Sequence, residues 1–147
     1  MAPRTLERQI TIAAPSAAVW KALTDAEELT RWFPLEARVQ PGVGGSVFVR
    51  WDHADQGESR ITIWEPERHL GTLGWAGDMP EIVTDYYLEA GGTDTRLRVV
   101  NSGFGRGADW DEMLDGFGYG WDFELRGLRQ YLERHRGYPR RVAWVRL

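Results

Sequence analysis

The sequence predicts an α+β fold in which a curved antiparallel sheet of six or seven strands wraps around one long C-terminal helix. Three observations lead to this fold class. Most of residues 35–102 alternate between apolar and polar side chains, which is typical of strands buried on one face. Short turns with glycine or proline separate these segments, which favours antiparallel neighbours. Residues 109–136 are the one stretch with helical periodicity long enough to cover such a sheet.

The chain begins with a strand and two short helices. Thr5–Ala13 alternates well enough to form the first strand, and a proline two residues later breaks it. Ala17–Leu23 then has the pattern of a short helix. Ala26–Trp32 is predicted as a second one, capped by the preceding Asp25 or Thr24, and proline at position 34 ends it. Two short helices therefore follow strand 1.

Six further segments read as strands, divided by turns that are rich in glycine and proline. They are Leu35–Gln40, Gly45–Trp51, Gly57–Trp64, His69–Trp75, Glu81–Ala90 and Thr93–Ser102. Because successive side chains in a strand point to opposite faces, we expect Val49 and Trp51 to share the covered face. The same alternation predicts one common face for Ile61 and Ile63. Charged residues fall on the opposite face, so the sheet needs cover on one side only.

The long helix has signals at both ends and an apolar stripe between them. Asp109 has the spacing of an N-cap, with Glu112 completing a capping box. Basic residues 134–136 suit the negative end of the helix dipole, and Gly137 is a stop signal. The stripe consists of Trp110, Leu114, Phe117, Trp121, Leu125, Leu128 and Leu132. This pattern predicts a helix over Asp109–Arg136 with one buried face.

Two features interrupt this helix. Gly116, Gly120 and Gly127 leave one flank without side chains, at a cost of about 1 kcal/mol each relative to alanine. Glu124 falls within the arc of the apolar stripe, where a carboxylate is unexpected. One interpretation is a helix that roofs a cavity, with Glu124 directed inward. The alternative is close packing at the glycines and a pair between Glu124 and an arginine at the rim.

Composition limits the classes of protein. A chain of 147 residues fits one domain, which we place at residues 1–136, followed by an extension, residues 137–147, expected as an edge strand or a subunit contact. The net charge of −4 argues against nucleic-acid binding, and the absence of cysteine excludes disulfides and thiol chemistry. No apolar run approaches the ~20 residues that span a membrane, so we expect no membrane insertion. The N-terminus lacks the apolar stretch of a signal peptide, which predicts a cytoplasmic location.

Motifs for metal or nucleophilic chemistry are missing from the sequence. The three histidines, His53, His69 and His135, are scattered and have no acidic or histidine neighbour at ligand spacing. G-x-S-x-G is absent, so the serine-nucleophile elbow is not present. We therefore predict no metal and no cofactor.

Several short motifs carry a resemblance to a known family. They are Ile12–Pro15, Val19–Asp25, Arg31–Phe33, Gly44-Gly45, Trp64–Pro66, Trp75, Thr95–Leu97, Ser102–Phe104 and Gly120-Trp121. In this order they resemble the START-like, or SRPBCC, superfamily, and most closely its bacterial AHSA-type branch, which is related to the activator of heat-shock-protein ATPase. The resemblance covers about residues 5–135 and leaves the C-terminal extension outside. It implies a helix-grip fold with a hydrophobic cavity between sheet and long helix.

The inward-facing positions and this superfamily theme together give a candidate ligand-binding set. It comprises Trp32, Phe33, Val49, Trp51, Ile63, Trp75, Tyr86, Leu97, Val99, Asn101, Phe104, Met113, Phe117, Gly120, Trp121 and Glu124. Within it Tyr86, Asn101 and Glu124 are the polar groups expected to orient a ligand in an apolar cleft.

Three functions remain open from the sequence. We expect a non-enzymatic protein, monomer or homodimer, that binds an apolar small molecule of lipid, polyketide or aromatic type. The second hypothesis is a co-chaperone or regulatory interaction domain, whose partner is a chaperone or another protein and whose setting is a stress response. The third is a cyclase- or aromatase-type enzyme in which Glu124, its pKa raised by burial, acts as general acid or base.

Overall fold

The structure is a computed structural model that describes residues 4–51, 56–75 and 81–136. In this part of the chain seven strands form one antiparallel sheet in the order β1-β7-β6-β5-β4-β3-β2. The strands are β1 (Arg4–Ile12), β2 (Glu36–Gln40), β3 (Ser46–Arg50), β4 (Gln56–Glu65), β5 (His69–Trp75), β6 (Ile82–Gly91) and β7 (Asp94–Phe104). The helices are α1 (Ser16–Thr24), α2 (Ala26–Leu29), α3 (Ala108–Gln130) and the π-helical turn η1 (Tyr131–His135). The predicted α+β helix-grip fold is confirmed, whereas the expected role of residues 137–147 lies outside the described residues.

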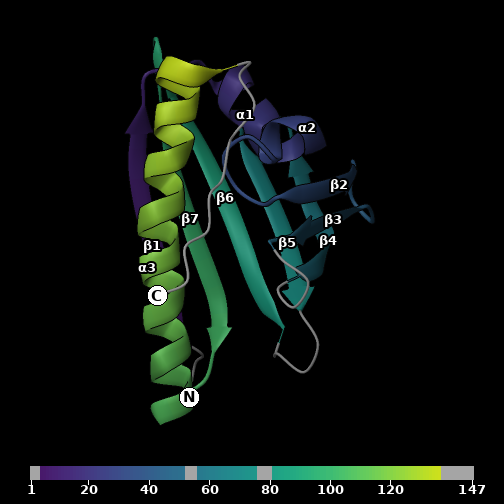
Figure 1. The fold of residues 1–147 in the computed structure, drawn as a ribbon, viewed down its shortest axis with the longest axis vertical. Helices are drawn as coiled ribbons and strands as arrows, with labels where there is room; N and C mark the ends of the chain where they lie inside the picture. Colours follow the sequence, from purple (N-terminus) through teal and green to yellow (C-terminus); the bar gives the residue numbers. More distant parts are fainter. Residues whose placement is uncertain (1–3, 52–55, 76–80, 137–147) are drawn as a thin grey trace, which may run out of the picture.

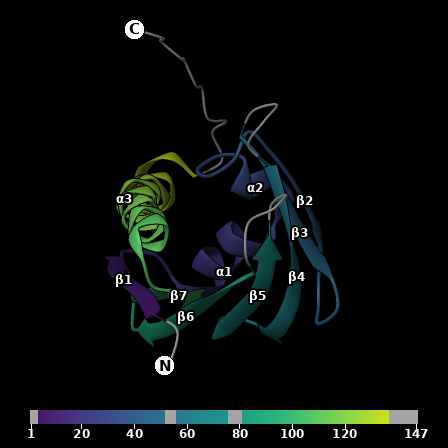
Figure 2. The same cartoon turned by 90° about the horizontal axis from the view of Figure 1, so that it is seen from below.

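The sheet curves around the inner side of the molecule, and the helices occupy that side (Figure 1). Strands β2 to β7 follow one another as antiparallel neighbours, while β1 pairs with the last strand, β7. Viewed along α3, the long helix stands beside β1 and β7, and α1 and α2 lie across one end of the curve (Figure 2). The two short helices thus carry the chain from one edge of the sheet to the other. Asp25 caps α2, because its carboxylate accepts a hydrogen bond from the backbone N–H of Glu27 at 2.9 Å. The sequence predicted either Asp25 or Thr24 as this cap.

The filled part of the core lies where α1 and α3 meet the β1, β6 and β7 side of the sheet. Its best-buried apolar residues, none more than 1% exposed, include Ile12, Val19, Leu97, Val99 and Leu128. The predicted stripe of the long helix is confirmed in its C-terminal half, where Trp121, Leu125, Leu128 and Leu132 are all buried. Its N-terminal members are half-buried. Helix α3 therefore seats most deeply at the end where α1 packs against it.

A β-bulge in β4 overturns one expected face. Ile61 pairs with Thr72, but Ile63 pairs with Gly71, so Thr62 is an extra residue and the alternation shifts by one. Ile61 is 1% exposed and belongs to the core. The prediction that Ile61 and Ile63 share one face is therefore wrong, because one inserted residue reverses every side chain beyond it.

The bulge also decides which residue of β4 turns inward. Trp64 packs edge-on against Trp20 of α1, with ring centroids 5.1 Å apart. Ile63 instead lies on the opposite face, beside Gly71 and Asp85: a Cβ placed on Gly71 would lie 3.0 Å from the Ile63 Cβ and 3.1 Å from the Asp85 Oδ1. Ile63 is thus removed from the candidate ligand-binding set.

A second bulge directs Phe104 into the core. Arg4 pairs with Phe104 and Thr5 with Ser102, so Gly103 is the extra residue. Gly103 has φ of 111°, and a Cβ there would lie 3.0 Å from the carbonyl oxygen of Glu81, so both conformation and space favour glycine. Phe104 is fully buried, edge-on to the ring of Phe117 at 5.3 Å. It holds the start of α3 against the sheet.

The predicted cap of the long helix is wrong. The helix begins at Ala108, its N-cap is Gly107, and no side chain caps it. The glycine takes φ of 119° and ψ of 171°, which other residues rarely adopt, and its carbonyl accepts from the N–H of Asp111 at 2.9 Å. Asp109 therefore lies inside the first turn, where its charge still faces the positive end of the helix dipole.

One long flank of α3 is fastened to β1 by ionic contacts that the sequence did not reveal. Arg8 donates from Nε to Asp122 at 2.7 Å, and Arg4 pairs with Asp111 at 2.6 Å. Near the other end, the backbone N–H of Ala13 donates to a carboxylate oxygen of Glu133. The opposite flank of α3, which includes the bare glycines, faces away from β1.

Two glycines of α3 test this asymmetry. A Cβ on Gly120 would meet no atom within 4 Å, so Gly120→Ala gains only the helix propensity and raises the free energy of unfolding by about 0.5–1 kcal/mol. A Cβ on Gly118 would lie 2.8 Å from Nη2 of Arg8, so Gly118→Ala displaces that guanidinium and gains less. Thermal unfolding should place G120A about 1–4 °C above the parent chain. Equal gains in both variants would contradict the described contact on the β1 flank.

Candidate functional site

Four aromatic rings from four separate parts of the chain meet on the inner side of the sheet. We call Phe33, Trp51, Tyr86 and Trp121 the inner aromatic cluster. Phe33 follows α2 and lies edge-on to Trp51, at the end of β3, with centroids 5.1 Å apart and planes at 88°. Phe33 also stacks on Trp121 of α3 at 5.8 Å, and Trp121 meets Tyr86 of β6 edge-on at 5.9 Å. The cluster thus joins the long helix to the middle and the far side of the sheet.

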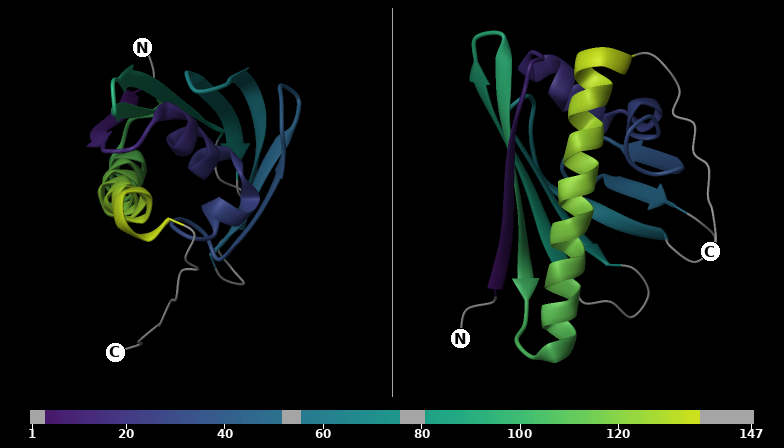
Figure 3. Two further views of the ribbon diagram at one scale, coloured as in Figure 1. Left: turned by 90° about the horizontal axis from the view of Figure 1, so that it is seen from above. Right: turned by 60° about the vertical axis from the view of Figure 1, so that its left-hand side comes forward.

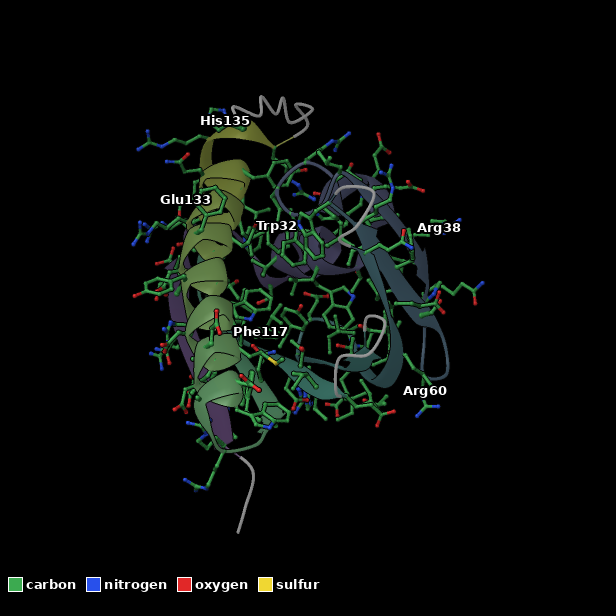
Figure 4. The ribbon with its side chains drawn as sticks, turned by 60° about the horizontal axis from the view of Figure 1, so that its bottom comes forward. Trp32, Arg38, Arg60, Phe117, Glu133 and His135 are labelled. Atoms are coloured by element: carbon green, nitrogen blue, oxygen red, sulfur yellow. The ribbon has the colours of Figure 1, made fainter. Side chains whose placement is uncertain are left out.

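Trp32 packs against the Phe33 ring of this cluster. Its ring stacks on Phe33 at 4.9 Å, and its indole N–H donates to the carbonyl oxygen of Ala22 at 2.9 Å. The side chain is 3% exposed, so it belongs to the core rather than to an accessible wall. Trp32 and Phe117 both point toward the space between α3 and the sheet, whereas Arg38 and Arg60 point outward (Figure 4).

A buried chain of hydrogen bonds fixes the Trp121 ring. The indole N–H of Trp121 donates to Oδ1 of Asn101 at 2.6 Å, and Nδ2 of Asn101 donates to the Thr84 hydroxyl at 2.8 Å. Because the indole N–H is only a donor, it also fixes which way the Asn101 amide points. Asn101 is 1% exposed. Its role is to position Trp121, which differs from the ligand-orienting role that the sequence predicted for it.

The hydroxyl of Tyr86 is the polar group of the cluster that is not used in a hydrogen bond between described residues. Burial raises the pKa of its phenol above the ordinary range, so the hydroxyl stays protonated at neutral pH. The ring nevertheless keeps part of its surface accessible. Among the described residues, none donates to or accepts from the Tyr86 hydroxyl in the hydrogen bonds of the structure. A deeply placed hydroxyl donor of this kind is suited to a carbonyl or hydroxyl of a bound molecule.

The inner face of the sheet divides into two unequal halves. Leu97 and Val99 on β7 are covered completely by the helices. On β2 and β3, in contrast, the inward-facing valines Val39, Val47 and Val49 are only partly buried, as is Trp51. Val39 and Val47 pack against the core, but apolar side chains on this second half keep part of their surface accessible, next to the inner aromatic cluster.

The free flank of α3 faces this accessible half. Met113, Phe117 and Glu124 are half-buried, and Gly120 is exposed with open space where a side chain would be. One carboxylate oxygen of Glu124 is buried. A buried oxygen fits both interpretations of Glu124, a group directed into a cavity and a member of a pair at the rim, so its part in the site stays a prediction. The side chain of Trp75 lies outside the described residues, so its part in the site stays a prediction.

The sequence missed a second buried acid. Glu28 in α2 is 4% exposed and accepts from the Tyr131 hydroxyl at 2.9 Å and from Nε of Arg136 at 3.3 Å. Lys21 approaches it at 3.9 Å. The only sequence signal was its place next to the buried Leu29 in a very short helix, which is too little for a prediction. These bonds tie α2 to the π-helical end of the long helix.

Residues 4–51, 56–75 and 81–136 contain no group of three or more His, Cys, Asp or Glu side chains placed to hold a metal ion. A hollow of about 240 Å³ lies on the β1 flank of α3, lined by Leu6, Arg8, Leu114, Asp115, Gly118 and Tyr119. It is separate from the inner aromatic cluster. No helix in these residues is long and apolar enough to cross a membrane.

This arrangement, a curved antiparallel sheet that grips a long C-terminal helix, defines a helix-grip protein. Residues 13–133 match the family described as "Activator of Hsp90 ATPase homolog 1-like protein". The chain belongs to this family, as its motifs predicted.

Solved structures show the same fold. CalU16 from Micromonospora echinospora is 23% identical with a TM-score of 0.75, over 90% of this chain and 78% of CalU16. DynU16, a putative protein in the dynemicin biosynthetic locus, is 26% identical with a TM-score of 0.82; the match spans 96% of this chain but only 51% of DynU16. The Aha1 dimer from Colwellia psychrerythraea is 21% identical with a TM-score of 0.80, over 91% and 99% of the two chains. None of the curated proteins compared with this chain matches it.

The Asn101–Trp121 bond can be tested by substitution. Asn101→Leu keeps a similar volume but leaves the indole N–H without its acceptor, which should lower the free energy of unfolding by about 1–3 kcal/mol. Urea denaturation measures this change. Ser102→Ala, at the next position and on the other face of β7, is the control and should stay within about 0.5 kcal/mol of the parent chain. If both variants unfold alike, the buried bond does not carry the stability assigned to it.

Proposed function

We propose that this protein binds an apolar, aromatic small molecule between the inner aromatic cluster and the free flank of α3. The observation that supports this most is that inward-facing apolar side chains stay accessible on one half of the sheet. Such residues are normally covered, since exposed apolar surface costs about 25 cal/mol per Å². A flat ring system stacked against Trp51 and Phe33 would cover it.

The polar groups narrow the ligand class. Tyr86 supplies one hydroxyl donor, and Glu124 supplies a partly buried carboxylate on the helix side. A ligand with one carbonyl or hydroxyl at its deep end and an apolar remainder suits this distribution. A relative from a biosynthetic locus, DynU16, is consistent with a small organic ligand.

A ligand panel tests the proposal directly. Lipids, flavonoids and polyketide-like aromatics should be titrated while tryptophan fluorescence and melting temperature are followed. We expect an aromatic member with a carbonyl group to quench fluorescence and raise the melting temperature, because a ligand that binds only the folded state stabilises it. If no member of the panel changes either quantity, the proposed site is wrong.

The Tyr86 donor can be tested with the ligand that binds. Tyr86→Phe removes only the hydroxyl and should weaken binding about 3- to 10-fold, the value of one neutral hydrogen bond. Tyr87→Phe is the matched control, since Tyr87 lies on the other face of the same strand, stacked on His69. Equal affinities in all three chains would contradict a role for Tyr86. Recovery of a converted ligand, with conversion lost in Glu124→Gln, would instead favour the cyclase- or aromatase-type function.

A co-chaperone function is the second candidate, and the family description favours it. The purified chain should then raise the ATP hydrolysis rate of an Hsp90, measured by phosphate release. A chain ending at Arg136 tests whether the basic residues 137–147 contribute to that contact. An unchanged hydrolysis rate at saturating concentrations of the full chain would remove this candidate.

A further inference from the structure

The outer face of α3 carries two large aromatic side chains that its own fold leaves exposed. Tyr119 is 78% exposed and Phe123 is 66% exposed, and they lie one helical turn apart. In the part of the chain that the structure describes, no strand or other helix lies over this side of α3 (Figure 3). Paired exposed aromatics are enriched at interfaces between proteins rather than on free surfaces.

The surface around this pair has the shape to receive a ring. Gly116 flanks Phe123 on the side turned away from β1, and a Cβ there would meet no atom within 4 Å. On the other side, Asp115 and Tyr119 border the hollow of about 240 Å³ described above. A neighbouring helix can therefore approach closely without meeting intervening side chains.

The charges on the same face select the orientation of the neighbour. Asp115 lies before the aromatic pair and Arg126 after it, both exposed, and neither forms an ion pair with any described residue. Consider a second copy of α3 that runs antiparallel to the first, with the two-fold axis on the outer face at the level of residue 121. In this arrangement position 115 of one helix lies opposite positions 126 and 127 of the other. Each Asp115 then faces the Arg126 of the other copy, and each Tyr119 faces the other Phe123. A parallel copy would set like charges against each other.

We propose that this face is a homodimer interface in which two α3 helices pack antiparallel through Tyr119 and Phe123. The Phe123 ring of each copy packs beside Tyr119 on the bare surface at Gly116. Two Asp115–Arg126 pairs close the contact, one at each end. Such a self-complementary surface forms a closed two-fold dimer and leaves the inner aromatic cluster free.

Sedimentation velocity over a range of protein concentrations tests the dimer. We expect a concentration-dependent dimer for the parent chain and, for Phe123→Glu, a dissociation constant higher by at least about 10-fold. Val43→Glu is the matched control, because Val43 is a 71% exposed apolar residue away from α3 and its loss should leave the dimer unchanged. A parent chain that stays monomeric, or a dimer that F123E does not weaken, would overturn the proposal.

Charge exchange tests the antiparallel orientation. Asp115→Arg alone and Arg126→Asp alone each bring two like-charge pairs together, so each variant should associate more weakly than the parent chain. A one-to-one mixture of the two variants restores both opposite-charge pairs, and the heterodimer should form with near-parental affinity at low salt. The difference should shrink as salt screens the exposed charges. If mixing restores nothing, the helices do not pack as proposed.

Discussion

The placement of α3 depends on one buried hydrogen bond, from the indole of Trp121 to the amide of Asn101. Ion pairs with β1 hold the helix at one side, but exposed pairs of this kind contribute little on their own. The Trp121–Asn101 bond lies instead in a nearly dry region, where an unpaired donor would be costly. It fixes the rotation of the helix about its axis. That rotation decides which residues of α3 face the accessible half of the sheet and which face outward.

The rotation gives the helix four distinct sides, and the outer one carries Tyr119 and Phe123. One side packs onto β7 and α1 and completes the core, and a second is fastened to β1. The third side carries Phe117, Gly120 and Glu124. It faces Trp51 and the partly buried valines of β2 and β3. Because the helix stands near one edge of a curved sheet, it cannot fill the whole curve. Apolar residues on β2 and β3, at the far side of the sheet from the helix, therefore stay only partly buried.

The sequence was sufficient for the architecture because the architecture follows from periodicity. Alternation predicted the strands, and the apolar stripe from Trp121 to Leu132 predicted the buried face of α3. The errors arose where a single residue changes the geometry. The extra residue Thr62 reversed Ile63, and a glycine with a rare φ rather than a side chain starts α3. Neither event leaves a periodic trace.

The site was predicted less well for a related reason. Phe33, Trp51, Tyr86 and Trp121 were all in the candidate set, but their mutual contacts depend on four elements that only the folded chain brings together. The sequence also treated Asn101 as a ligand contact, although its amide is used by Trp121 and Thr84. Polar residues at inward positions can serve a ligand or the core, and the pattern is the same for both.

The pairing of β1 with β7 has a consequence for how the chain reaches this state. Arg4 is bonded across the sheet to Phe104, so the first strand made during synthesis finds its place only after about a hundred further residues have emerged. Contacts this distant in sequence slow folding, because the chain between them must be ordered first. Until then the apolar side of β1 is uncovered. The ribosome-bound chain therefore passes through a long interval in which its first strand has no partner of its own.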